Sequence, residues 1–157
     1  MDQEPANALS PAVVRTLTAN DHARLALIDQ RLTGRSRGEW YRQRLRRALA
    51  ESDVNVSLGA EVDGALVGAV LASIQFGEYG RPERLAVIDT ILVHSAFQRQ
   101  GVAAALLEQL IKNLRALGVD RVRTEVAWTE SSLLGFLAGA GFIPVPRLVL
   151  EHGLGES

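Results

Sequence analysis

Two features of the sequence could take part in chemistry: a strand-to-helix junction that contains a glycine, and a lone carboxylate at Asp89. The first turn of a helix has unpaired backbone N–H groups and a partial positive charge. Gly101 and the small Ala103 and Ala104 let a bulky anion approach that backbone, and Arg99 could add a positive charge. The junction is therefore suited to hold a pyrophosphate. An ordinary helix start with a glycine would give the same local pattern.

Asp89 is the lone carboxylate in the apolar run from Leu85 to Val93. Strand alternation predicts that it shares a face with Val87, Ile91 and Val93. Burying an unpaired carboxylate is costly, and such a cost is often retained for function. Asp89 is therefore a candidate general base. The alternative interpretation is a structural carboxylate that caps a loop or pairs with an arginine.

Strands and helices alternate in an order that predicts one mixed sheet. Asn20 or Asp21 could cap the first helix, and Asp63-Gly64 is a strong hairpin signal. The expected strands lie at 13–17, 54–62, 65–76, 85–93, 122–126, 143–145 and 147–151, and the expected helices at 21–32, 40–49, 103–117 and 131–140. Antiparallel hairpins come first and a β-α-β crossover follows. We therefore expect an α/β fold with a mixed, mostly antiparallel sheet and helices on both faces.

The composition excludes several classes of protein. A chain of 157 residues with 47% hydrophobic residues predicts a single domain over residues 1–157, with its core at about 13–151. A net charge of -1 argues against a nucleic-acid binder. No apolar run is long enough for a membrane span, and the N-terminus lacks a secretory pattern, so we expect a cytoplasmic protein. The absence of cysteine excludes thiolate metal sites and a cysteine acyl-enzyme, and three scattered histidines predict no metal site: His22, His94 and His152.

The residues from Gln98 to Ala103 match the Q/R-x-x-G-x-G/A signature of the GNAT (Gcn5-related N-acetyltransferase) family. The flanking elements also resemble that family, including a short helix that ends in Gly141-Phe142. The resemblance covers roughly residues 13–151 by element order and is specific over about 85–142. It implies acetyl-CoA as acyl donor, with no metal. It also implies cofactor contacts by strand backbone at Ile91, Leu92 and Val93, and by the signature at Gln98, Arg99, Gln100, Gly101, Val102, Ala103 and Ala104.

The resemblance implies that an acetyl group passes directly to an amine in a ternary complex. The neutral amine is needed for attack, so a base or a water chain to a base is expected, and Asp89 is the candidate. A backbone N–H near Val93 would polarise the oxyanion. The tyrosine that serves many members as general acid is replaced by Leu137, and Tyr79 could approach the site in its place. The missing tyrosine favours an alternative, an acyl-CoA-binding sensor or regulatory module without turnover.

Seven arginines crowd the region of the two N-terminal helices, and they are Arg31, Arg35, Arg37, Arg42, Arg44, Arg46 and Arg47. Charge runs on helices are often solvated faces. In the family this region lies beside the acceptor cleft, which implies an acidic acceptor or an acidic surface on a protein acceptor. The acceptor amine could belong to a small molecule, a protein lysine or a protein N-terminus. The transferred acyl group could also be larger than acetyl. The sheet edges and the closing strands would allow a homodimer.

Overall fold

The computed structural model describes residues 11–50, 56–77 and 80–155. The chain divides into two compact units, one that ends at Glu125 and one that begins at Val126. Eight elements of the first unit are β1 Val13–Thr16, α1 His22–Thr33, α2 Gly38–Ala50, β2 Leu58–Val62, β3 Ala65–Phe76, β4 Arg84–Val93, α3 Val102–Ala116 and β5 Arg121–Thr124. Short 3-10 helices lie at Ala19–Asp21 (η1) and Ser95–Phe97 (η2). The second unit contains α4, Ser131–Gly139.

The five strands form one sheet in the order β1-β2-β3-β4-β5. The first three pairings are antiparallel and the last, between β4 and β5, is parallel. The predicted hairpin turn lies between β2 and β3, with Asp63 and Gly64 both at positive φ. The connection from β4 to β5 runs through α3, as a parallel pair requires a crossover.

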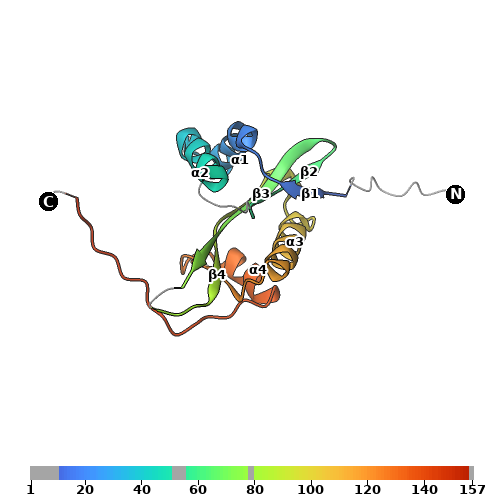
Figure 1. Ribbon diagram of the computed structural model, residues 1–157. Helices are drawn as coiled ribbons and strands as arrows, with labels where there is room; N and C mark the ends of the chain where they lie inside the picture. Colours follow the sequence, from blue (N-terminus) through green and yellow to red (C-terminus); the bar gives the residue numbers. More distant parts are fainter. Residues whose placement is uncertain (1–10, 51–55, 78–79, 156–157) are drawn as a thin grey trace. The chain divides into compact units, whose positions relative to one another are not determined.

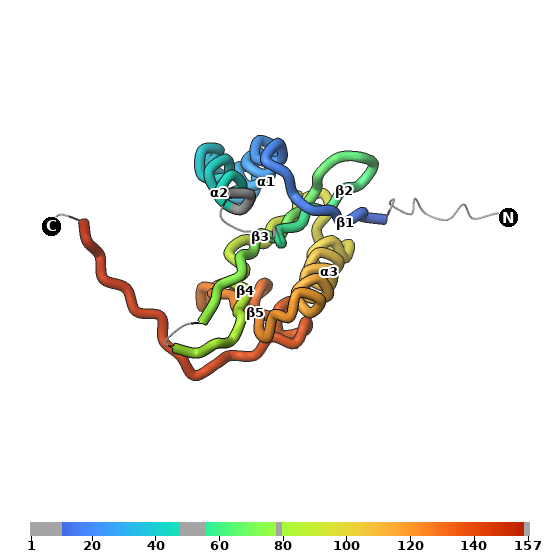
Figure 2. The backbone as a smooth tube through the Cα atoms, in the orientation of Figure 1, coloured from blue at the N-terminus to red at the C-terminus, as the bar shows by residue number. Residues whose placement is uncertain are grey.

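Helices cover both faces of this sheet (Figures 1 and 2). α1 and α2 pack together on one side of β3, and α3 packs on β2, β3 and β4 from the other side. Residues 66–72 of β3 are all buried, which means that the side chains on both faces of the strand are covered. The predicted mixed, mostly antiparallel sheet with helices on both faces is confirmed.

Each helical layer has its own apolar contacts. The core under α1 and α2 consists of Leu17, Leu25, Ile28, Tyr41, Leu45, Leu66, Ala69, Leu71 and Leu92. α3 buries a stripe at helical spacing, made of Val102, Leu106, Leu107, Leu110 and Leu114. Burial of these side chains is the main favourable term for a fold of this kind. The two layers fix α2 and the start of α3 against the same central strands.

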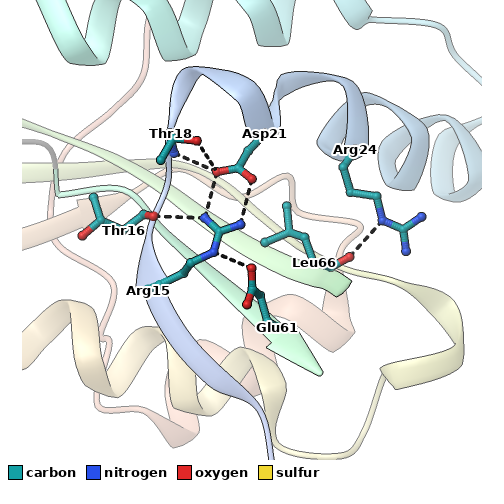
Figure 3. A network of polar contacts seen from close by, with 7 residues as sticks. All are labelled: Arg15, Thr16, Thr18, Asp21, Arg24, Glu61 and Leu66. Carbon is teal, nitrogen blue, oxygen red and sulfur yellow. Dashed lines mark hydrogen bonds and ion pairs between the residues drawn. The ribbon is translucent and has the colours of Figure 1, made fainter. Parts of the chain in front are cut away.

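An ion-pair network joins β1 to its neighbours (Figure 3). The Arg15 guanidinium donates to Glu61 on β2 at 2.6 Å and to both carboxylate oxygens of Asp21 at 2.8 Å. Thr18 N–H also donates to Asp21, at 2.7 Å. The bond from Arg15, against the opposing effect of burial, holds the pKa of Asp21 below its ordinary value. Asp21 stands at the N-cap of α1, as predicted, but its side chain makes no capping bond there because Arg15 and Thr18 occupy it.

The C-terminal region differs from the prediction. Residues 142–155 contain no strand, so the expected closing strands at 143–145 and 147–151 are wrong. Their large apolar side chains are exposed, and the set is Ile143, Val145, Leu148, Val149, Leu150 and Leu154. Pro144 and Pro146 lack the N–H that a strand ladder needs. The local alternation of apolar residues therefore did not decide the structure of this segment.

The region described contains neither a helix able to span a membrane nor a cluster of residues able to hold a metal ion. The predicted second strand began at Val54, and residues 51–55 lie outside the described part of the chain. The observed β2 begins at Leu58.

Candidate functional site

The predicted phosphate loop is a left-handed turn followed by a helix start. Arg99 has φ of 62° and Gly101 has φ of 81°, both in the left-handed region. Gly101 is the N-cap of α3, and a Cβ placed on it would meet no atom within 4 Å. Left-handed residues beside a helix N-terminus turn successive N–H groups toward one concavity. Glycine is thus required at position 101 by its backbone conformation rather than by crowding.

The backbone N–H groups of the loop donate to no atom of the described residues. The first helical bond of α3 runs from the N–H of Ala105 to the carbonyl of Gly101, at 2.9 Å. Across the described residues, none of the six N–H groups from Arg99 to Ala104 donates a hydrogen bond, and no side chain caps the helix. Unpaired N–H groups at a helix start favour an anion. The fit to a pyrophosphate therefore depends on backbone donors and open space at Gly101.

Two glutamine side chains hold the loop in place by donating hydrogen bonds to backbone carbonyls. The Gln98 amide nitrogen donates to the carbonyl of Val93 at 3.1 Å, and that of Gln100 donates to the carbonyl of Ala96 at 3.2 Å. Both side chains thus form hydrogen bonds within the protein, which the signature alone did not indicate. The bond from Gln98 ties the loop to the last residue of β4.

β4 has an open edge next to this loop. β5 pairs only with residues 85–88 of β4, and the Thr124 hydroxyl closes the ladder by donating to the carbonyl of Ile88 at 3.0 Å. On the other edge, His94 N–H donates to Val67 of β3 at 2.7 Å. Successive residues of an antiparallel strand direct their N–H and C=O groups toward opposite edges of the strand. The groups of Leu92 therefore face β3, whereas those of Ile91 and Val93 face the edge along which β5 pairs only as far as Ile88.

Asp89 lies in a β-bulge, and its expected surroundings were wrong. Leu71 pairs with Thr90 and Ala72 pairs with Ile88, so Asp89 is the extra residue of β4. The bulge breaks the alternation: Asp89 reaches α2, whereas Val93 lies near Val102, at the start of α3. Asp89 therefore does not share a face with Val93. Its side chain is 35% exposed rather than buried.

The Asp89 carboxylate has two partners. Arg44 of α2 donates to its Oδ2 through Nε at 2.9 Å and through Nη2 at 2.7 Å. The Thr90 hydroxyl donates to its Oδ1 at 2.8 Å. The alternative interpretation from the sequence, a carboxylate paired with an arginine, therefore describes its contacts. Arg44 and Thr90 were not among the predicted site residues. The arginine excess of α2 was visible in the sequence, but its partner on β4 was not.

His94 stands where β4 ends and belongs to the loop. Its Nδ1 accepts the N–H of Ala96 at 3.0 Å, so a neutral ring carries its proton on Nε2. That Nε2 lies 3.3 Å from a guanidinium nitrogen of Arg31 on α1. Two donor groups thus face each other at the end of β4.

Tyr79 lies outside the described residues. Tyr41 is fully buried under α1 and α2, and its burial, together with the nearby Asp29, raises the pKa of its phenol. Leu137 is buried in α4, in the second unit. Ser131 is the first residue of α4 and does not cap it, because Glu130 occupies the N-cap position.

A family model decides the classification of the chain. The model of the Acetyltransferase (GNAT) family matches residues 24–142, which include most of α1, the bulged strand β4, the loop before α3, and α4. The chain belongs to the GNAT acetyltransferase family. The resemblance predicted from the signature and the order of the elements is thus confirmed.

Solved structures of GNAT acetyltransferases share this fold. Aminoglycoside N-acetyltransferase AAC(6')-Iy in complex with CoA has a TM-score of 0.78 at 15% identity, over 96% of this chain and 100% of the other. Ribosomal-protein-alanine N-acetyltransferase from Brucella melitensis biovar Abortus 2308 has a TM-score of 0.71 at 19% identity, over 90% and 100%. An aminoglycoside acetyltransferase, HMB0005, from an uncultured soil metagenomic sample has a TM-score of 0.65 at 22% identity, over 94% and 99%. At these identities the likeness concerns the fold.

Proposed function

We propose that this GNAT protein binds acetyl-CoA and transfers its acetyl group to an amine by direct attack in a ternary complex. The observation that carries the proposal is the set of six unpaired N–H groups at residues 99–104, next to the open edge of β4. Acetyl-CoA has a pyrophosphate and an extended, amide-containing arm, and these two features match the two surfaces. Acetyl-CoA supplies an activated thioester.

The loop and the edge of β4 bind different parts of acetyl-CoA. The N–H groups from Arg99 to Ala104 hold the pyrophosphate, with the Arg99 side chain adding charge. The outward N–H and C=O of Ile91 and the N–H of Val93 pair with the pantetheine amides as a neighbouring strand would, while the carbonyl of Val93 already accepts the Gln98 amide. Leu92 contributes through the strand rather than through its own N–H, since that group faces β3. Gln98 and Gln100 act by holding the loop in place.

The chain supplies a proton acceptor and a donor for the developing oxyanion. A backbone N–H near Val93 polarises the thioester carbonyl. Asp89 takes up the proton that the ammonium group must lose before attack. Asp89 lies four positions before Val93, about 13 Å at the 3.3 Å rise per residue of a regular strand, so the proton reaches Asp89 through water. The amine nitrogen then bonds to the carbonyl carbon, the C–S bond breaks, the nitrogen loses a second proton to water, and CoA leaves as thiolate.

A second function has a specific observation in its favour. Leu137 stands where many family members have the tyrosine that protonates the leaving thiolate, and it is buried. A thiol has a pKa near 8.5, so its thiolate can leave without that help. A sensor that binds acyl-CoA without turnover is the alternative. Release of free CoA in the presence of an amine panel separates the two, because a sensor releases none.

Calorimetric titration with acetyl-CoA tests the proposed site. We expect the unmodified protein to bind and Gly101→Glu to lose binding, because the new carboxylate would repel the pyrophosphate at a position of strained φ. Gly64→Glu is the matched control, since Gly64 also has positive φ, of 78°, and open space, at the β2–β3 turn. The control should bind as the unmodified protein does. Absence of binding by the unmodified protein would refute the proposed function.

A further inference from the structure

Charge is distributed unevenly between the helical region and the rest of the chain. Residues 22–50 contain eight arginines and two carboxylates, Asp29 and Glu39, whereas the whole chain has a net charge of -1. Both carboxylates are already paired, Asp29 with Arg37 and Glu39 with Arg42. A local excess of positive charge of this size attracts anionic ligands.

Two of these arginines reach β4, and they do so at the two ends of its unpaired part. Arg44 of α2 donates to Asp89, at the bulge. Arg31 of α1 faces the Nε2 of His94, at the strand end. The basic helices therefore lie against the segment of β4 from which β5 has separated. An amine that approaches this segment from the α1–α2 side meets the arginines first.

Four arginines of these helices are available to an anion. Within the described part of the chain, none of Arg31, Arg35, Arg46 and Arg47 forms an ion pair with a carboxylate. Arg47 and the exposed Trp40 lie on the same helical stripe as Arg44, one turn to either side. From Trp40 to Arg47 this stripe spans about 10 Å. Arg44, in the middle of this stripe, already holds Asp89, so the stripe offers a ligand the Arg47 guanidinium and the exposed Trp40 ring.

We infer that the acceptor is an amine carried by an acidic peptide segment, whose carboxylates pair with Arg31, Arg46 and Arg47, which have no carboxylate partner among the described residues, rather than with Arg44, which holds Asp89. The inference rests on the proposed function, because it names the second substrate of that site. One small amine with one carboxylate would pair with one arginine, whereas successive Asp and Glu residues can pair with several. Aminoglycosides, named for two of the similar structures, carry several ammonium groups, which the same arginines would repel.

Binding to the CoA-loaded protein tests this inference without requiring turnover. The probe is a peptide with a free N-terminus and alternating Asp and Glu, labelled at its C-terminus and followed by fluorescence anisotropy. Its control has Asn and Gln in place of Asp and Glu. We expect the acidic peptide to bind about tenfold more tightly at low salt, as several exposed ion pairs together would give. The difference should shrink as salt screens the charges.

Variants locate the surface. Arg46→Gln with Arg47→Gln should weaken binding of the acidic peptide about threefold or more, whereas Arg115→Gln, which removes one exposed charge from α3, should not change it. Equal binding of the two peptides would overturn the inference. The inference would also be overturned if Arg115→Gln weakened binding of the acidic peptide as much, per charge removed, as the double variant does. Competition by free glutamate as strong as that by unlabelled peptide would overturn it too. Absence of acetyl-CoA binding by the unmodified protein would instead refute the proposed function. Calorimetric titration with acetyl-CoA tests the proposed function, and anisotropy titration with the peptide tests this inference, so the two failures can be told apart.

Discussion

At the scale of single residues, Asp89 and Arg44 form a contact that links α2 to β4. The pair is partly exposed, with side-chain exposures of 15% for Arg44 and 35% for Asp89. An exposed pair contributes little to stability, so the pair is better explained by what it positions. Arg44 and Thr90 fix the direction of both carboxylate oxygens, Oδ2 toward α2 and Oδ1 toward the Thr90 hydroxyl.

Replacing Asp89 with Asn should separate turnover from cofactor binding. Asn keeps the size of the side chain but cannot take up a proton, so the turnover rate should fall at least about tenfold, within the range for general base catalysis. Acetyl-CoA affinity should stay nearly unchanged, as calorimetry would show. Asp120→Asn is the control, because Asp120 only accepts the N–H of Arg84 at the other end of β4. An unaffected rate in the Asp89 variant would remove Asp89 from the mechanism.

At the scale of elements, the start of α3 is fixed by close contact with β3. A Cβ on Gly68 would lie 3.0 Å from the Val102 side chain and 3.1 Å from the carbonyl of Leu92. The carbonyl belongs to the β4 ladder and cannot retreat as a flexible side chain would. Gly68 therefore lets the first turn of α3, with its unpaired N–H groups, approach the end of β4.

Gly68→Ala should destabilise the protein and weaken acetyl-CoA binding together. Overpacking of a close contact typically costs about 1–3 kcal/mol, and the displaced Val102 would move the loop away from β4. Urea unfolding gives the first effect and calorimetry the second. Gly38→Ala is the matched control, because its new Cβ would meet Ala26 at an ordinary 3.9 Å and alanine favours a helix. A fully stable Gly68→Ala protein with normal binding would contradict this account of the contact.

At the scale of the whole molecule, the C-terminal segment is the part that the sequence pattern described least well. Leu148 and Leu150 are 87% and 86% exposed, although the sequence predicted a strand at residues 147–151. A strand is stable only when its backbone finds a ladder and its apolar face finds a core. Neither is provided within residues 142–155 as the structure has them. The single domain expected over residues 1–157 and the homodimer remain predictions.

The exposure of this segment predicts tolerance to polar substitution. Leu148→Ser with Leu150→Ser should change the free energy of unfolding by no more than about 0.5 kcal/mol for each site, as for other exposed positions. Leu106→Ala, at a fully buried site of α3, should cost about 2–5 kcal/mol. Both values come from urea unfolding curves. A cost well above 1 kcal/mol for the double serine variant would mean that the segment is covered in solution.

The sequence by itself determined the family, the order of elements through α4, and the glycine turn at the start of α3, because these depend on local periodicity and on a short contiguous motif. β3, for example, has the predicted bounds of residues 65–76. Only the tertiary structure decided which groups face one another. The bulge at Asp89 changed the face of that side chain, Arg44 reached it from 45 residues away, and the loss of pairing beyond Ile88 opened the edge of β4. Strand register and ion pairs between distant elements depend on how whole layers pack, and no local pattern of residues encodes that packing.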